Sequence, residues 1–527
     1  MAERESSSTW GPLRLSLFRA LWLAAVASNV GTWMHNVGAE WLMTTLSPSP
    51  FVVALMQTAE TAPTFLLALP AGALADIVDR RRLLLFSQAW MLCAAVALAA
   101  SALAGLANPT VLLLLTFSLG LGSAMNAPAW QAIVPELVPR EELASAVSLN
   151  SVAFNIARAV GPALGGLVVA AAGPWAVFLL NSLSFVGVIL VIYRWRREKV
   201  ESISPAERVA GAMRAGVRYA RHAPELRNVL VRTAVFALSA SALWALMPLV
   251  ARKELGLGAS QYGLLLGCLG AGAVAGAFVI SWARGAVSVN VLVVLGTLVF
   301  AGATAALGYV RVYPVLCAAM LCGGLAWMTA MSSLNISVQT VVPEWVRARA
   351  LALYLLAFFG SLAVGAAAWG AAAERAGLSS TLLAASAALL AGLAVAPFFP
   401  LRGGEGLDLN PSLHWSEPTF VQEPPPEDGP VLVTVEYFID PARSVEFARV
   451  MRESKRIARR DGATRWGLFT DPARPGRYLE TFLVESWGEH MRQHARVTYE
   501  DRIVHELLRS FHVGDAPPVV THMVAEK

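Results

Sequence analysis

The stretch Ser148-Leu-Asn-Ser-Val-Ala-Phe-Asn-Ile-Ala-Arg158-Ala-Val-Gly161-Pro162-Ala-Leu-Gly165-Gly166 lies inside an apolar run that covers 147–170. At 1.5 Å per residue, a helix of that length crosses the hydrocarbon core of a bilayer. An arginine at the centre of such a helix costs about 2.5–3.5 kcal/mol to insert into lipid, so Arg158 is expected to face protein or a water-filled cavity. A 4-3-4 spacing places four residues on one helical face: Ser151, Asn155, Arg158 and Pro162. A polar face at this depth is typical of a channel, a transporter or an intramembrane sensor.

The composition also indicates a membrane protein. Of 527 residues, 56% are hydrophobic and only 15% are charged. The basic surplus belongs to residues 1–402, which hold 26 Lys and Arg against 16 Asp and Glu. Because that surplus lies between apolar segments, it indicates membrane loops and gives no argument for nucleic-acid binding. The cysteines show no spacing of a metal site or a disulfide framework, and free thiols are expected: Cys93, Cys268, Cys317 and Cys322.

Apolar runs long enough to span a bilayer recur along residues 20–400, and they predict twelve transmembrane helices. The runs lie near 20–45, 51–75, 83–107, 111–134, 147–170, 174–193, 229–250, 260–283, 287–308, 312–337, 350–372 and 378–398. Loops after the even-numbered runs hold 16 Lys and Arg, whereas the alternate loops hold four. Positive charge marks the cytoplasmic side, so both termini and everything after the last run are predicted to be cytoplasmic.

A basic segment, 194–228, divides the runs into an N-terminal half, 1–193, and a C-terminal half, 229–400. The halves share a repeat, because Gln131-Ala-Ile-Val-Pro-Glu-Leu-Val138 reappears 208 residues later as Gln339-Thr-Val-Val-Pro-Glu-Trp-Val346. Parallel six-helix repeats place a substrate site at their interface, near the middle of the membrane.

After Pro400 the pattern becomes that of a soluble protein. Residues 401–429 are rich in Gly, Pro and acids and are predicted to form a linker. Residues 430–527 alternate in the order βαββαβ, a ferredoxin-like α+β domain: strands Val431–Phe438, Thr464–Thr470, Tyr478–Glu485 and Val519–Val524, and helices Ser444–Arg460 and Ser486–Ser510. The predicted fold class is therefore an all-α membrane protein of twelve transmembrane helices in two six-helix repeats, followed by this small domain.

The twelve-helix plan and the loop motifs resemble the major facilitator superfamily. Gly72-Ala-Leu-Ala-Asp76-Ile-Val-Asp-Arg80-Arg81-Arg82 is similar to the signature of its loop between helices 2 and 3, although Ile77 and Asp79 depart from that pattern. Gly161-Pro162-Ala-Leu-Gly165-Gly166 is similar to the helix-5 signature of its antiporters. The combination resembles the bacterial branch that contains the enterobactin exporter and macrolide efflux pumps. The resemblance implies that Gly72, Asp76, Arg80, Arg81, Gly161, Pro162, Gly165 and Gly166 act in the conformational change.

The C-terminal segment resembles the antibiotic-biosynthesis-monooxygenase-like domains, which pair as dimeric α+β barrels. Glu485-Ser-Trp487-Gly-Glu-His490-Met-Arg-Gln-His494 carries most of that likeness. It implies a possible homodimer through this domain. Four aromatic residues are expected to fill the barrel core: Trp466, Phe469, Phe482 and Trp487. His490 and His494 stand one helical turn apart and are able to share a metal ion, but two histidines without a nearby third ligand are more typical of surface residues. No metal or cofactor is predicted.

Arg158 is the main candidate for contact with substrate or for coupling. The alternative is a structural arginine that is tied to Asn155 and to backbone carbonyls. Glu60 is the acid deepest inside the second run, and in a proton-coupled transporter it is the first carboxylate expected to take up and release the proton. The alternatives are a fixed Glu60–Arg158 pair or a solvated cavity acid. The remaining candidates are Asn155, Glu40, His35, Trp244 and Asn335, and an apolar cavity in the second half suits a bulky amphiphile.

We therefore predict a multi-pass transporter of the bacterial inner membrane, without catalytic residues, that exports a lipophilic or amphiphilic molecule, drug-like or siderophore-like, by proton antiport. Its partners are a small-molecule substrate, protons and the lipid bilayer. One alternative is a membrane-tethered enzyme or sensor in which the C-terminal domain acts on or detects a hydrophobic molecule. Another is an importer of the same superfamily.

Overall fold

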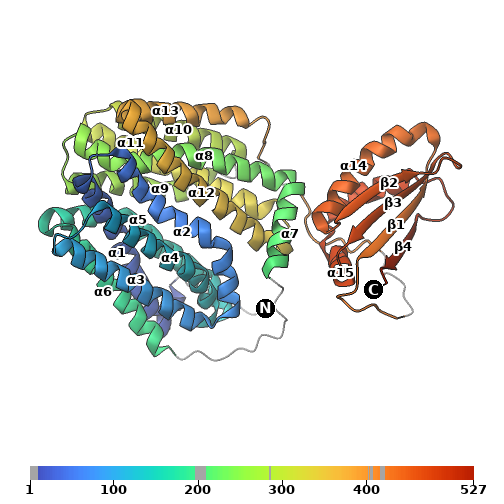
Figure 1. Cartoon of the computed structure of the whole chain (residues 1–527), viewed down its shortest axis with the longest axis horizontal. Helices are drawn as coiled ribbons and strands as arrows, with labels where there is room; N and C mark the ends of the chain where they lie inside the picture. The colour runs from blue at the N-terminus through green and yellow to red at the C-terminus, as the bar shows by residue number, and fades with distance from the viewer. Residues whose placement is uncertain are drawn as a thin grey trace, which may run out of the picture. The chain divides into compact units, whose positions relative to one another are not determined.

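The computed structural model describes residues 10–195, 209–283, 286–401, 403, 407–415 and 422–526 (Figure 1). Parts of the basic segment 194–228 and of the predicted linker lie outside the described residues. The chain forms two compact units. Unit 1 comprises Met1–Ala206, Val231–Asn335 and Tyr354–Phe399, and unit 2 comprises Glu207–Leu230, Ile336–Leu353 and Pro400–Lys527.

Long helices that begin and end at the breakers in the sequence form unit 1, although the first residues of α8 and α12 and the last residues of α11 belong to unit 2. In the first half these are α1 (Ser16–Leu46), α2 (Pro50–Ile77), α3 (Arg80–Leu103), α4 (Pro109–Leu137), α5 (Leu143–Ala172) and α6 (Pro174–Arg194). In the second half they are α8 (Pro224–Leu249), α9 (Ala259–Ala283), α10 (Val289–Tyr309), α11 (Tyr313–Thr340), α12 (Glu344–Ala376) and α13 (Leu378–Gly392). Proline occupies the first turn of α2, α4 and α6, where its missing N–H costs no hydrogen bond.

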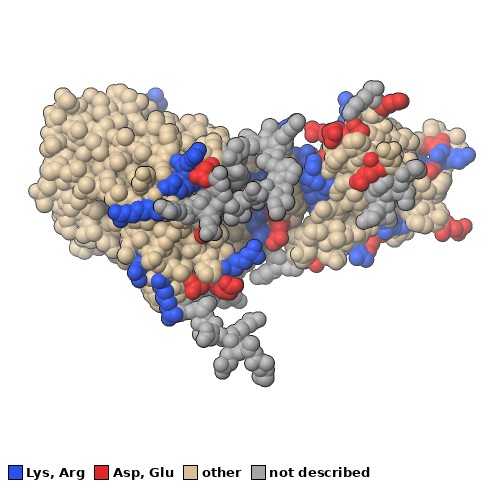
Figure 2. All heavy atoms as spheres, turned by 90° about the horizontal axis from the view of Figure 1, so that it is seen from below, with Lys and Arg blue, Asp and Glu red and all other residues tan. Residues whose placement is uncertain are grey.

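Eleven helices of the described chain are long and apolar enough to cross a membrane. Helix α1 is not among them, although its 31 residues exceed the required length. It carries several polar residues among its apolar ones, including Asn29, His35, Asn36 and Glu40. The passage of α1 through the membrane therefore stays a prediction, whereas the other eleven spans agree with the apolar runs. Figure 2 shows the corresponding surface, with a wide area of unit 1 free of Lys, Arg, Asp and Glu.

The repeat is visible in the helix junctions. Gly173, between α5 and α6, has φ +90°, and Gly377, between α12 and α13 and 204 residues later, has φ +83°. Both positions need the left-handed conformation that glycine adopts without a steric penalty. Within the first half α5 packs on α1, and it also packs on α9 of the second half. The two halves are therefore joined along α5.

Unit 2 contains a four-stranded antiparallel sheet. Its elements are α7 (Val209–His222), β1 (Val431–Phe438), α14 (Ser444–Asp461), β2 (Arg465–Thr470), β3 (Arg477–Val484), α15 (Trp487–Arg496), α16 (Tyr499–Ser510) and β4 (Val519–Val524). The strand order is β2-β3-β1-β4, with β1 pairing antiparallel to both β3 and β4. These bounds confirm the four predicted strands and the helix predicted over Ser444–Arg460.

The single helix predicted over Ser486–Ser510 is wrong. The chain forms α15 and α16 there because Thr498 and Asp501 build a capping box: each side chain accepts a hydrogen bond from the other residue's backbone N–H. That arrangement satisfies the free amides of a new helix start. The core prediction is also wrong at Phe469, which is 58% exposed. Phe469 stands opposite Leu479 on the exposed face of the sheet, whereas Phe482 and Trp487 are buried as expected.

Segments distant in sequence meet inside unit 2. Helix α7 packs on α14, and the Arg218 guanidinium lies 2.9 Å from a carboxylate oxygen of Glu489 on α15. Glu489 also accepts from Arg496, whose guanidinium lies 4.4 Å from the ring centroid of Trp345. Trp345 belongs to the repeated motif that ends at Val346. Within unit 2, the C-terminal segment therefore contacts α7, the helix of the basic segment, and the second copy of the repeated motif, Gln339–Val346.

Candidate functional site: a two-sided cavity between the halves

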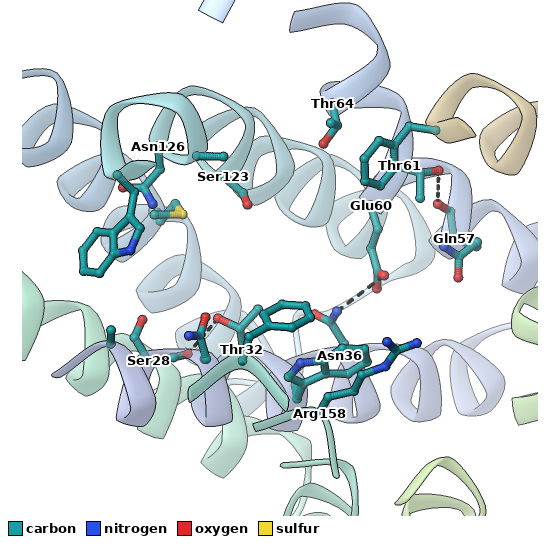
Figure 3. Close-up of a pocket in the computed structure, with 18 of the residues that line it drawn as sticks. Ser28, Thr32, Asn36, Gln57, Glu60, Thr61, Thr64, Ser123, Asn126 and Arg158 are labelled. Atoms are coloured by element: carbon teal, nitrogen blue, oxygen red, sulfur yellow. Dashed lines mark hydrogen bonds between the residues drawn. The ribbon is translucent and has the colours of Figure 1, made fainter. Parts of the chain in front are cut away.

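Unit 1 contains a partly open cavity of about 700 Å³ (Figure 3). Residues from all six helices of the first half line it, together with residues from α8, α9, α11 and α12 of the second half. The volume lies within the range of small-molecule sites, which is roughly 300–1,000 Å³. The cavity thus occupies the place that the repeat predicts for a substrate site.

The two sides of the cavity differ in chemistry. Every Asn, Gln, Ser, Thr, Glu and Arg side chain that lines it comes from the first half: Ser28, Asn29, Thr32, Asn36, Glu40, Gln57, Glu60, Thr61, Thr64, Gln88, Ser123, Asn126, Gln131 and Arg158. The second half contributes apolar and aromatic residues: Trp244, Leu266, Trp327, Phe358, Phe359 and Leu362. Trp327 packs against Trp244 and Phe358 with ring centroids 5.4 and 6.0 Å apart. The first half also contributes the aromatic residues Trp33, Trp130, Phe154 and Phe185. A ligand in this cavity therefore meets polar and aromatic groups on one side and only apolar and aromatic groups on the other.

Arg158 lines the cavity from the middle of α5 and is 8% exposed. Among the described residues no hydrogen bond or ion pair engages its guanidinium, and its Nε is buried without a partner. Asn155 donates instead to the carbonyl of Ser151, at 2.9 Å. The arginine is thus not tied to Asn155. A buried, unpaired guanidinium is costly unless an anionic or hydrogen-bond-accepting group meets it during function.

Glu60 faces the same cavity from α2. One carboxylate oxygen accepts a 3.5 Å hydrogen bond from Asn36, and the other is buried without a partner (Figure 3). Glu60 and Arg158 form no ion pair with each other within the described structure. A smaller cavity of about 130 Å³ also touches Glu60 and reaches His35. His35 is 2% exposed, its two ring nitrogens lack partners, and its ring packs 4.6 Å from that of Phe178.

Glu40 joins the two halves. Its carboxylate lines the large cavity and accepts a hydrogen bond from the hydroxyl of Tyr262 on α9, a residue with no exposed surface. Further polar contacts between the halves lie near the α1–α2 junction. Arg252 donates to Thr44 at 3.2 Å, Lys253 donates to the Pro48 carbonyl at 2.5 Å, and Ser49 donates to Glu374 at 2.7 Å. The halves are closed together at this end of the helices.

Glycines bring the helices around the cavity into close contact. A Cβ atom built on Gly161 would lie 2.6 Å from the Cβ of Trp33, and one on Gly165 would lie 2.8 Å from the Cα of Met34, so both pack α5 on α1. A Cβ on Gly166 would lie 2.5 Å from the carbonyl oxygen of Ala259 on α9. Pro162, in the same motif, is buried. The predicted packing motif therefore contacts both halves.

The second half repeats this arrangement 204 residues later. A Cβ on Gly365, the counterpart of Gly161, would meet Ser241 and Leu238 of α8. A Cβ on Gly370, the counterpart of Gly166, would lie 2.5 Å from the Cβ of Ala54 on α2. The counterpart of Arg158 is Leu362, which lines the same cavity. Gly161 and Gly166 thus have glycine counterparts, whereas Trp369 stands at the position of Gly165, and Arg158 has no charged counterpart.

We expect Gly166→Ala to lower the melting temperature of the purified protein, because the added methyl group has no space between α5 and α9. Overpacking of this kind costs about 1–3 kcal/mol. Gly187→Ala on α6 is the matched control, since its Cβ would meet nothing within 4 Å. Equal melting temperatures for the two variants would contradict the close packing of α5 on α9.

The predicted loop motif lies beside helix ends of the first half. Arg80 is 2.9 Å from Glu136 and donates to the Ala132 carbonyl, which joins α3 to α4. Arg81 donates to the carbonyls of Ile192 and Tyr193, which joins α3 to α6. Gly72 and Asp76 lie on α2, and their side chains lie outside the described residues. The described part of the motif therefore connects helices within one half.

The structure gathers most of the predicted site residues and leaves two aside. Arg158, Glu60, Glu40 and Trp244 line the large cavity, and His35 lines the smaller one. Asn155 and Asn335 are not among the residues that line either cavity. The sequence prediction named Glu40 and His35 of α1 but missed the other polar residues of that helix that line the large cavity, and it missed the aromatic wall around Trp327. Ser28, Asn29, Thr32, Asn36 and Glu40 recur at helical spacing, which is a signal that the sequence offers.

Comparisons with known proteins agree with this architecture. A sequence profile described as "Transmembrane secretion effector" matches residues 7–527. The chain is 26% identical over 359 residues to the enterobactin exporter of Salmonella typhimurium, covering 67% of this chain and 84% of that relative. It is 28% identical over 166 residues to the staphyloferrin A transporter of Staphylococcus aureus, covering 31% of this chain and less than half, 42%, of that relative.

Solved structures share the fold of the helical part. A nucleoside transporter superposes with a TM-score of 0.61 at 11% identity, covering 73% of this chain and all of that one. A bacterial homologue of the human lysosomal transporter Spinster, in an inward-facing and unoccupied conformation, gives a TM-score of 0.58 at 15% identity. That match covers 74% of this chain and 97% of the other. At these identities the likeness concerns the fold alone.

Proposed function

The chain belongs to the transmembrane secretion effector family of the major facilitator superfamily, and from that premise we propose that it exports an amphiphilic or lipophilic small molecule by alternating access. The observation that carries this proposal is the two-sided cavity. A bulky molecule with an apolar body and an anionic or hydrogen-bond-accepting group fits an aromatic wall that faces Arg158. The relatives named for enterobactin and staphyloferrin A support a siderophore-like cargo, and the apolar wall also admits lipophilic drugs.

Alternating access needs both halves to span the membrane, with α1 as the twelfth crossing. The arginine-rich loops support cytoplasmic termini, which places the α1–α2 junction outside. The contacts of Thr44, Pro48 and Ser49 with the second half then close the outer side, so this conformation faces the cytoplasm. The proposed domains are the two halves, 1–193 and 229–400, the basic loop 194–228, the linker 401–429 and the C-terminal domain 430–527.

We further propose that protons drive export in exchange for the cargo. Glu60 is the carrier, because its carboxylate shares the cavity with Arg158 and has one oxygen without a partner. Glu40 is engaged by Tyr262 in this conformation and is less free to exchange a proton. Binding of an anionic cargo at Arg158 and protonation of Glu60 would then alternate in one cavity.

Inside-out membrane vesicles test the direction of transport. Vesicles from a strain that expresses the protein, energised so that the lumen is acidic, are expected to accumulate a catecholate siderophore or a lipophilic antibiotic. Collapse of the pH gradient with a protonophore should release the accumulated molecule. Accumulation that is the same in vesicles lacking the protein would contradict the proposal.

For the C-terminal domain we propose a ferredoxin-like fold related to the monooxygenase-like domains, which the strand order β2-β3-β1-β4 supports. One face of its sheet exposes Phe469, Leu479 and Met523, and Phe469 stands opposite Leu479 in the β2–β3 register. These exposed apolar side chains lie beside the Glu436–Arg477 ion pair, and they suit pairing with a second copy. A second candidate function for this domain is that of a sensor or enzyme, tethered to the membrane part, that detects or acts on a hydrophobic molecule.

Deletion of 403–527 tests whether the C-terminal domain is required for export or is accessory to it. If the domain only pairs copies of the chain, export per molecule in the membrane should stay within about twofold of the full-length protein, since the cavity is intact. A loss of export at unchanged abundance would instead assign the domain a part in transport and favour the sensor.

A further inference from the structure

Three histidines meet inside the C-terminal domain. His490 and His494 lie one turn apart on α15, and His522 lies on β4. Each offers a ring nitrogen, and these three nitrogens lie within 4.8 Å of one another. We propose that they form a binding site for a divalent transition-metal ion of the zinc class, with His490, His494 and His522 as its protein ligands.

The fold explains how the third ligand arrives. Strand β4 pairs with β1, and His522 stands opposite Val433 in that register. This pairing brings a residue 28 positions beyond His494 against α15. His490 is 1% exposed. The interpretation of His490 as a surface residue is therefore wrong, because the partner that buries it comes from a distant strand.

A hydrogen bond orients one of the ligands. Nδ1 of His490 lies 3.2 Å from Oε1 of Gln493, an oxygen that can only accept, so Nδ1 carries the proton. The lone pair is then on Nε2, which is buried and has no partner among the described residues. Nε2 of His494 is buried without a partner as well. Metal-bound histidines are commonly held in this way through their other ring nitrogen.

The three imidazole nitrogens determine which metal ions the site would prefer. Zinc–nitrogen bonds of 2.0–2.1 Å at tetrahedral angles place ligand nitrogens about 3.3 Å apart, so rotamer adjustments of about 1.5 Å complete the site. Three imidazoles without a carboxylate favour zinc, copper, nickel or cobalt over magnesium or calcium. Three protein ligands leave a fourth position open for water or another small donor. The nearby His414 and His505 bond to each other at 2.9 Å and do not belong to the group.

The test uses the full-length protein in detergent, purified without a polyhistidine tag and stripped with a chelator. After dialysis against Zn²⁺, we expect about one zinc ion per chain by mass spectrometry. Co²⁺ should give the visible absorption of a four-coordinate site. His494→Gln and His522→Gln should each weaken zinc binding at least about tenfold. At equal concentration, Zn²⁺ should raise the melting temperature of the unmodified protein more than that of either variant.

His512→Gln is the matched control, because His512 lies in the same domain and bonds to the backbone of Phe438. It should retain full zinc binding. Circular dichroism of each variant verifies folding, and two independent ligand variants keep the test decisive if one of them fails to fold. Substoichiometric zinc in the unmodified protein, or equal zinc in all variants, would overturn the proposed site. Loss of zinc binding in His414→Gln, with zinc binding retained in His522→Gln, would also overturn the proposed site. That result would place the zinc at His414 and His505 instead.

Discussion

Replacing Arg158 with methionine is expected to reduce export about 10- to 100-fold while the protein remains folded and abundant. A hydrogen bond to a charged group contributes roughly 1.5–3 kcal/mol, and its loss from the cargo corresponds to that range of affinity. The guanidinium has no described partner inside the protein. Methionine should therefore leave the melting temperature unchanged or raise it. Export of a fixed cargo and thermal unfolding of the purified variant provide the two measurements.

These two measurements separate the functional arginine from a structural one. Removal of one partner from a buried structural pair costs about 3–5 kcal/mol, so a structural Arg158 would show a clear fall in melting temperature. Arg311→Gln is the matched control, since that arginine is exposed and pairs with Glu254 at 3.2 Å, away from the cavity. A variant of Arg158 that unfolds early, or that exports normally, would contradict the role assigned here.

Glu60→Gln is expected to abolish accumulation driven by a pH gradient and to leave passive exchange of cargo intact. Glutamine keeps the size of the side chain and its hydrogen bond with Asn36 but cannot release a proton. Gradient-driven accumulation should fall to within about twofold of the level without a gradient, whereas counterflow of labelled cargo should continue. Glu254→Gln, an exposed acid outside the cavity, should behave like the unmodified protein.

The outcome also tests the alternatives for Glu60. If Glu60→Gln retained full gradient-driven export, the coupling role would pass to another group, and Glu40 with its Tyr262 partner would be the next candidate. If counterflow were lost together with accumulation, Glu60 would be a cargo ligand and not a proton carrier.

Much of the helical architecture follows from local sequence, because a membrane span needs only a long apolar run and a breaker. The repeat offset even places Gly365 opposite α8, as Gly161 lies opposite α1. Contacts between residues distant in sequence were harder to predict from the sequence. Neither the Glu40–Tyr262 contact nor the aromatic wall around Trp327 has a spacing signal, since each depends on how two halves pack. In contrast, Ser28, Thr32 and Asn36 precede the predicted Glu40 at four-residue spacing on α1 and could have been found.

The C-terminal domain shows the same limit. Alternation of polar and apolar residues predicted its strands, and yet the break between α15 and α16 depends on the Thr498–Asp501 capping box. The histidine group was missed because His522 is adjacent to His490 only after β4 pairs with β1. Phe469 is exposed because it lies on the sheet face opposite to that of Trp466 and Phe482, which an alternation along β2 could have indicated. Contacts made by strand pairing are not encoded in short sequence windows.

The central claim, that this cavity exchanges an amphiphilic cargo for protons, is tested most directly by proton flux in proteoliposomes. Vesicles reconstituted with the purified protein and filled with a pH-sensitive dye receive cargo on the outside, without any other gradient. The account predicts that the lumen becomes alkaline as cargo enters and protons leave, and that Glu60→Gln vesicles admit cargo without this change. Entry of cargo into unmodified vesicles with no change in luminal pH would contradict it.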